Sequence, residues 1–324
     1  MESRPGLLQL AGREAPALYV IGLGATVLGA SALVAGIAGG GIGLAMLALA
    51  LIGIGGIALS GASALQRSVD TPVAGWRGPG PLAVFWTTIP WALLAQLLIA
   101  ALVTSVGAAA ALTTPLGTLA LAAASNFATV LIIGLVVVGS GAVRWRDLIL
   151  ATPASSPSTL PQPDRRGGLV GDLFWGVALA PPILTAAGLF ATLVLSGTGL
   201  SAPVVLPPAM SAVDLAANAL TAGLIAPIGE ELLYRGVIAQ AWARQSSARR
   251  AILFSAIVFA FAHTLTVGGT SVADGASLAA VAFVVRLPLG IALGWLWIRR
   301  RSIVATIALH AAYNLAIVAI AALA

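Results

Sequence analysis

The chain has 324 residues, of which 60% are hydrophobic and 8% are charged, with a formal net charge of +6. Because about a quarter of the residues in a soluble globular domain are charged, this composition excludes such a domain and predicts an all-α, polytopic membrane protein. No cysteine is present, which excludes disulfides, thiolate nucleophiles and cysteine-ligated metal sites. The sixteen basic residues are all arginines, which in membrane proteins mark cytoplasmic loops more often than nucleic-acid sites.

Apolar stretches long enough to cross a hydrocarbon layer of about 30 Å occur nine times along the chain, and eight spans are the alternative count. They lie near residues 16–38, 42–65, 82–106, 118–140, 172–197, 212–242, 249–267, 276–298 and 303–323. Arginines occur in every second loop, which predicts a cytoplasmic N-terminus and a C-terminus outside. Since Ala and Gly are abundant and Lys is absent, we expect an integral protein of the plasma membrane of a bacterium with a GC-rich genome.

A Pro/Ser-rich segment divides the predicted spans into two regions. Residues 1–150 hold the first four spans, to which the sequence assigns no role. Residues 151–171 include the polar run PASSPSTLPQPDRRGG and are expected to form an irregular cytoplasmic linker. Residues 172–324 hold the remaining five spans and every group that we expect to be reactive.

The segment GEELLYRG, from Gly229 to Gly236, places two carboxylates and an arginine within an apolar span. On insertion scales each such charge costs about 2.5–3.5 kcal/mol at the centre of a membrane helix. Glu231 and Arg235 are four residues apart, so they can form an ion pair on one helix face. Glu230 is rotated by about 100° from that face, and an unpaired carboxylate in a membrane span is a candidate functional group.

The natural partners of Glu230 are the two histidines of the chain, His263 and His310, each in its own apolar span. At about 1.5 Å per helical residue, all three lie roughly 12–20 Å from the arginine-bearing ends of their spans, so they can meet at one depth. A spacing of four residues places Phe259 on the face of His263 and Asn314 on the face of His310. A carboxylate base, imidazoles that hold a water and an amide that donates to an oxyanion are suited to the hydrolysis of an amide bond.

Three short motifs contain these residues: EELLYR at Glu230–Arg235, FAFAH at Phe259–His263 and HAAYN at His310–Asn314. They match, in order, the motifs EExxxR, FxxxH and HxxxN. Residues 172–324 therefore resemble the CPBP intramembrane proteases, an Abi-like family that includes the CAAX prenyl proteases and bacteriocin-processing enzymes.

The resemblance implies that Glu230 and His263 activate a water, and that His310 and Asn314 position the scissile carbonyl and stabilise the oxyanion. Family members have been described both as metalloproteases and as glutamate-dependent enzymes. If zinc is bound, we expect Glu230, His263 and His310 to be its ligands, because carboxylate and imidazole are competent zinc ligands. An HExxH motif is absent, and we favour a glutamate-activated water with no obligatory cofactor.

Four further residues are expected to support this site. The resemblance implies that Glu231 and Arg235 hold its geometry, and Phe259 is expected to pack within the core. Arg286 matches none of the three motifs. We expect it to pair with Glu231 or Asp214, and the alternative is that it binds a carboxylate of the substrate.

We therefore expect an intramembrane endopeptidase whose partners are the lipid bilayer and a peptide or membrane-protein substrate, without nucleic acid. Two other classes stay open. A proton-coupled transporter or channel also uses intramembrane Glu and His, although the sequence shows no internal repeat of the kind found in many transporters. A catalytically inactive immunity or scaffold protein would keep the same fold.

Overall fold

The computed structural model describes residues 9–10, 13–36, 39, 41–70, 75–150, 163–164, 166–200, 206–265 and 267–323. The regular structure in these ranges is helical, apart from two two-residue strands and one isolated bridge. The strands β1 (Gln9–Leu10) and β2 (Arg13–Glu14) are antiparallel, and the bridge joins Leu150 to Ser302. The all-α prediction is therefore confirmed. Most of the predicted linker, residues 151–162 and 165, lies outside the described residues.

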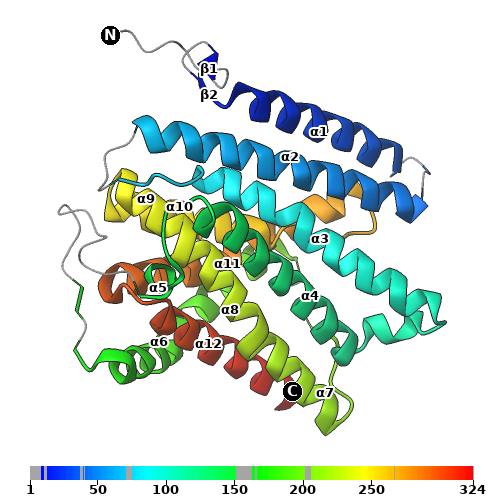
Figure 1. Cartoon of the computed structure of the whole chain (residues 1–324). Coiled ribbons are helices and arrows are strands. Elements are labelled where there is room, and N and C mark those ends of the chain that lie inside the picture. Colours follow the sequence, from blue (N-terminus) through cyan, green and yellow to red (C-terminus); the bar gives the residue numbers. More distant parts are fainter. Residues whose placement is uncertain are drawn as a thin grey trace. The chain divides into compact units, whose positions relative to one another are not determined.

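Two compact units make up the chain, one from Met1–Leu112 with Ala120–Trp145 and the other from Thr113–Leu119 with Arg146–Ala324. The first unit contains α1 (Pro16–Ala35), α2 (Gly41–Asp70), α3 (Pro81–Ser105), η2 (Ala109–Thr113), most of α4 (Pro115–Ile133) and η3 (Gly134–Val138). Within this unit α2 packs against both α1 and α3 (Figure 1).

The second unit contains the segments in which the sequence predicts reactive groups. Its elements are α5 (Trp145–Ile149), α6 (Gly168–Thr198), α7 (Ala212–Leu220), η5 (Thr221–Ile225), α8 (Ala226–Glu231), η6 (Leu232–Ala239), α9 (Gln240–Gln245), α10 (Ala248–Ala262), α11 (Val272–Arg300) and α12 (Ile303–Leu323). Here α6 packs against α11 and α12, and α10 packs against α11.

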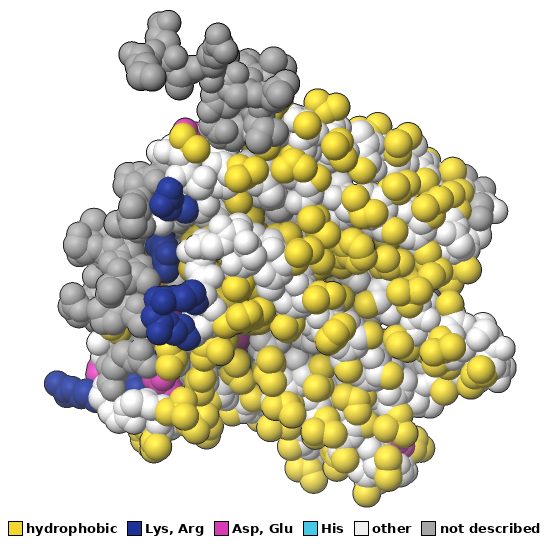
Figure 2. Space-filling model, viewed as in Figure 1, with side chains coloured by type: hydrophobic (Ala, Val, Ile, Leu, Met, Phe, Trp, Pro, Cys, Tyr) yellow, Lys and Arg dark blue, Asp and Glu magenta, His cyan; other side chains and the backbone are white. Residues whose placement is uncertain are grey.

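Eight helices in the described residues are long and apolar enough to cross a membrane, and they match eight of the nine predicted spans. The exception is the predicted span 249–267, where α10 has 15 residues, or about 22 Å at 1.5 Å per residue. The helix ends at Ala262, and His263 and Thr264 form a turn after it. The visible face of the described residues is mostly hydrophobic, as a lipid environment requires (Figure 2). The orientation of the termini, which depends on nine crossings, stays a prediction.

Close backbone approach and one buried ion pair fix α6 in the second unit. A Cβ added at Gly176 of α6 would lie 2.5 Å from the carbonyl oxygen of Ala305 in α12, so only glycine allows these helices to approach this closely. Near the start of α6, Oδ1 of buried Asp172 accepts a hydrogen bond from Nε of Arg300 at 2.8 Å and also lies 2.8 Å from Nη2 of the same guanidinium. This pair joins α6 to the end of α11.

We expect Gly176→Ala to lower the free energy of unfolding by about 1–3 kcal/mol, because the added methyl group overlaps the backbone of α12. The matched control is Gly188→Ala on the same helix, where a Cβ meets no atom within 4 Å. That change should leave stability equal or raise it by up to about 1 kcal/mol through helix propensity. Thermal unfolding of the detergent-solubilised protein measures both, and equal midpoints for the two variants would contradict this packing.

Candidate active site

Residues 212–245 form one apolar helical segment with two irregular turns. Both η5 and η6 are π-helical, and Pro227 lies between them in the first turn of α8. Proline lacks the N–H needed for a regular helical hydrogen bond, and π-turns occur frequently at functional sites. Glu230 and Glu231 are the last two residues of α8, so they lie where the helical twist changes.

The carboxylate of Glu231 is hydrogen-bonded on two sides and fully buried. Nη1 of Arg235 donates to its Oε1 at 3.0 Å, and Nδ1 of His310 donates to the same oxygen at 2.9 Å. Nη2 of Arg235 donates to the carbonyl of Gly290 at 3.1 Å, and its guanidinium lies 4.8 Å from the Phe259 ring. The ion pair that the i,i+4 spacing predicts is thus formed, and it joins η6, α11, α10 and α12.

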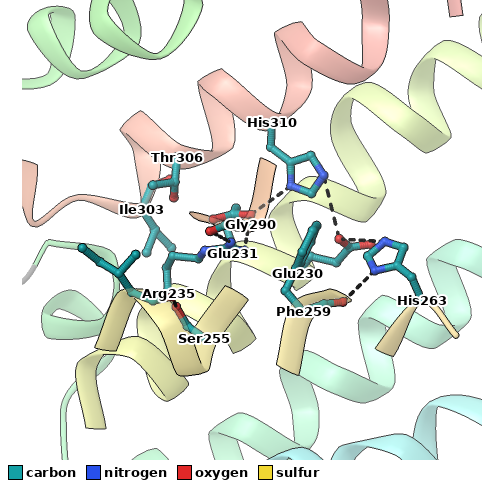
Figure 3. Close-up of polar contacts among 11 residues, drawn as sticks. Glu230, Glu231, Arg235, Ser255, Phe259, His263, Gly290, Ile303, Thr306 and His310 are labelled. Carbon is teal, nitrogen blue, oxygen red and sulfur yellow. Dashed lines mark hydrogen bonds and ion pairs between the residues drawn. The ribbon is translucent and has the colours of Figure 1, made fainter. Parts of the chain in front are cut away.

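Glu230 points to the other side of the His310 ring, towards both imidazoles (Figure 3). Its Oε2 lies 3.8 Å from Nε2 of His263 and 3.9 Å from Nε2 of His310. These separations exceed hydrogen-bond length, and this oxygen has no hydrogen-bond partner within the described part of the chain. The side chains of Glu230 and His263 are 27% and 23% exposed, whereas His310 is 3% exposed. The structure therefore brings together the three groups that the sequence predicts, with two of them accessible.

The hydrogen bonds of the two rings define which nitrogen carries the proton. Nδ1 of His263 lies 2.8 Å from the carbonyl oxygen of Phe259, which can only accept, so Nδ1 is the donor. Nδ1 of His310 donates to Glu231, whose carboxylate is ionised because it pairs with Arg235. In neutral rings Nε2 is then an acceptor in each case, and both Nε2 atoms face the carboxylate of Glu230. Three acceptors that converge in this way need a hydrogen-bond donor or a cation between them.

The spacing of the three acceptors is too wide for a formed zinc site. Two ligands of a tetrahedral zinc ion, each about 2.0–2.1 Å from the metal, lie about 3.3 Å apart, compared with the 3.8 and 3.9 Å observed. Among the described residues, no group of three or more His, Asp or Glu side chains is placed to hold a metal ion. Two acceptors of one water, each about 2.8 Å from its oxygen, lie about 4.4 Å apart, so the observed separations fall between the spacing around a zinc ion and the spacing around a water.

The remaining predicted residues occupy different positions around this centre. Nδ2 of Asn314 donates to the carbonyl of Ala222 at 2.9 Å, so one amide hydrogen joins α12 to η5, and the second has no acceptor among the residues that the structure describes. Phe259 is buried and contacts both imidazole rings, which agrees with a packing role. The expected pairing of Arg286 with Glu231 or Asp214 is wrong, since no described carboxylate lies within 4 Å of it.

The pairing fails because both carboxylates have nearer partners. Glu231 is bonded to Arg235 and His310, and Asp214 accepts from the hydroxyl of Ser211 at the start of α7. The carbonyl of Gly290 was missed by the motif analysis, because a backbone acceptor has no signature in the sequence. Tyr313 was also missed, although it lies inside the HAAYN motif, three residues after His310.

Part of the chain matches a known protein family. Residues 212–316 match a family model described as Rce1-like, Type II CAAX prenyl endopeptidase Rce1-like. The resemblance predicted from the three motifs is confirmed. No curated protein and no solved structure matches the chain. The Rce1-like segment runs from α7 into α12, and α6 and the first unit lie outside it. Together with the eight apolar helices, this match identifies an integral membrane protein.

Within the Rce1-like segment, we expect Arg235→Met to lower the free energy of unfolding by about 3–5 kcal/mol, because it leaves Glu231 as a buried charge without its counter-ion. Adding Glu231→Gln should recover part of that loss, since the amide is neutral and can still accept from His310. Thermal unfolding in detergent measures each variant. Arg146→Met is the control, because its side chain is 67% exposed and its ion pair is weak. If Arg235→Met and Arg146→Met unfold alike, the buried pair does not support the fold.

Proposed function

We propose that the chain is an intramembrane endopeptidase in which Glu230 activates a water to attack a peptide carbonyl. The observation that carries the proposal is the position of Glu230 Oε2, which lies between the Nε2 atoms of His263 and His310 without a hydrogen-bond partner in the described residues. A water in this gap can donate one hydrogen to Glu230 and the other to His263. Both lone pairs of its oxygen then stay available for the substrate.

The chemical step follows from these roles. Glu230 removes one proton from the water, and the oxygen forms a bond to the scissile carbonyl carbon as the carbonyl oxygen becomes an oxyanion. The C–N bond then breaks, the leaving nitrogen takes up the removed proton, and the new carboxyl group keeps the second hydrogen of the water. His263 holds the water through Nε2, because its Nδ1–H is fixed on the carbonyl of Phe259.

His310 and Asn314 are proposed to stabilise the oxyanion. Nε2 of His310 lies 3.9 Å from Oε2 of Glu230, so a water between them can pass the proton on to His310, and the resulting N–H is a donor to the oxyanion. Asn314 lies on the same face of α12, and the Nδ2 hydrogen that Ala222 does not use is a second donor. Glu231 and Arg235 act as positioning residues, because they hold the His310 ring through its Nδ1.

The proposed substrate is a peptide or a membrane protein whose cleavage site reaches the membrane. The Rce1-like match makes a peptide with a prenylated cysteine near its C-terminus the first probe. An unprenylated peptide of the same sequence tests whether the lipid is recognised.

We expect Glu230→Gln and His263→Ala each to lower peptide cleavage by about 10²–10⁴-fold, the usual contribution of a general base and its partner. The assay is cleavage of both probes by purified protein in lipid nanodiscs, followed by mass spectrometry. Asp214→Asn is the matched control, because it removes a partly exposed carboxylate from the same apolar segment. Cleavage that survives Glu230→Gln would contradict the mechanism. Loss of ion flux without any cleavage by the parent would indicate a transporter.

Because the proposed reaction uses a glutamate-activated water and no metal, we expect cleavage to continue after treatment with EDTA and 1,10-phenanthroline. Metal analysis of the active protein should give well below one equivalent of zinc per chain. Loss of cleavage on chelation, with recovery on addition of zinc, would contradict this expectation and would assign Glu230, His263 and His310 as ligands.

A further inference from the structure

Arg286 is a charged residue of the second unit that the proposed reaction does not use. It lies near the middle of α11 and is partly exposed. Its single hydrogen bond in the described residues is long, from Nη1 to the carbonyl of Ala282 in its own helix at 3.4 Å. A guanidinium has five N–H donors in a fork that matches a carboxylate. Most of this donor capacity is therefore unused.

The helix register places Arg286 beside the reactive groups. Added Cβ atoms at Gly290 and Gly294 would contact Ala256 and Ile252, so α10 and α11 run antiparallel with these residues at the same level. One turn before Gly290, Arg286 is then level with the end of α10, where His263 lies. In agreement with this register, Arg286 interacts electrostatically with both Glu230 and His263. The guanidinium thus lies within electrostatic range of Glu230 and His263, at the level where α10 ends.

A second unused donor lies close by on α12. Tyr313 and Arg286 interact electrostatically, and the Tyr313 hydroxyl forms no hydrogen bond with the described residues. Tyr313 lies three residues after His310, so it is adjacent to the proposed oxyanion site along the helix surface. Both side chains are partly exposed, so a ligand can reach them.

We propose that Arg286 and Tyr313 bind a carboxylate of the substrate peptide, next to the scissile bond and on the His263 side of the site. This inference rests on the proposed peptidase function and adds a specificity determinant to it. A guanidinium inside a membrane protein is costly unless it is paired. A peptide carboxylate supplies the missing acceptor for the guanidinium fork and for the tyrosine hydroxyl. The group is either the α-carboxylate at the peptide C-terminus or the side chain of an Asp or Glu.

The alternative is that Arg286 only favours the ionised form of Glu230. In that case its loss would weaken the base for every substrate and would move the pH profile of cleavage. A binding role predicts a loss that depends on the charge of the substrate and leaves the pH profile in place. These two outcomes separate a substrate contact from a positioning residue.

The experiment compares the parent with Arg286→Gln, Arg286→Lys and Tyr313→Phe on three forms of one peptide. The first has a free C-terminal carboxylate, the second a C-terminal amide, and the third an amide with a Glu beside the scissile bond. Arg299→Gln is the control, because it removes an exposed arginine from the same helix. The readouts are kcat/KM in nanodiscs over a range of pH, and peptide binding to Glu230→Gln protein by fluorescence anisotropy.

We expect Arg286→Gln to lower kcat/KM about 10- to 100-fold on the carboxylate form that is recognised, as loss of hydrogen bonds to a charged group requires. Arg286→Lys should recover part of this loss, and Tyr313→Phe should cause a smaller one. On the neutral amide Arg286→Gln should stay within about twofold of the parent. A loss on the peptide with the free C-terminus would assign the α-carboxylate as the bound group, and a loss on the peptide with Glu would assign the side-chain carboxylate.

Equal loss on charged and neutral peptides, or no loss on either, would overturn the carboxylate site while leaving the peptidase proposal in place. If the parent cleaves no form of the peptide, the peptidase proposal fails. The carboxylate site is then tested by the fluorescence-anisotropy binding measurement alone. Binding of the carboxylate form must then weaken with Arg286→Gln added and stay unchanged with Arg299→Gln added.

Discussion

Oε1 of Glu231 accepts hydrogen bonds from Arg235 and His310, and the three side chains are 0–3% exposed. The low polarity of this environment makes each charge expensive unless it is paired. Glu231 and Arg235 pair across the junction of α8 and η6, and the bond from His310 to Glu231 can form only when α12 is held in register with that segment. The bond from Arg235 to the carbonyl of Gly290 adds α11 to the same group. This buried cluster therefore fixes the relative positions of the helices that carry the reactive residues, and the rest of the site depends on it.

The buried cluster also divides the charges of the site into two classes. Glu231 and Arg235 neutralise each other and are inaccessible. Among the described residues, Glu230 has only the two imidazoles within ion-pair distance, and Arg286 has no carboxylate within that distance. Both side chains are partly exposed. The groups that stabilise the fold are thus separate from the groups available to a substrate, although Glu230 and Glu231 are adjacent in the sequence. The shared ring of His310 connects the two classes.

Much of this arrangement could be predicted from the sequence, because charges are so rare in an apolar chain. The i,i+4 spacing predicts the Glu231–Arg235 pair, and the two histidines are the available partners for Glu230. The contacts of Arg286 could not be predicted, because its level relative to α10 depends on how closely Gly290 lets the helices approach. The predicted span 249–267 was one too many, because α10 ends at Ala262 and the predicted apolar stretch continued past that end. Hydropathy alone does not report such an end.

The proposed reaction depends on two imidazoles, each protonated on Nδ1, that direct Nε2 towards Glu230. The chain has two histidines, so NMR of protein labelled with ¹⁵N-histidine resolves each ring nitrogen. The variant His263→Ala is enough to assign the signals to the two rings. Proton position in a neutral ring is read directly from the ¹⁵N shifts of its two nitrogens. We expect a proton on Nδ1 of both rings, and we expect the ¹⁵N shifts of both Nε2 atoms to change in the Glu230→Gln variant. A bare Nδ1 in either ring, or Nε2 signals that do not respond to Glu230→Gln, would contradict this expectation.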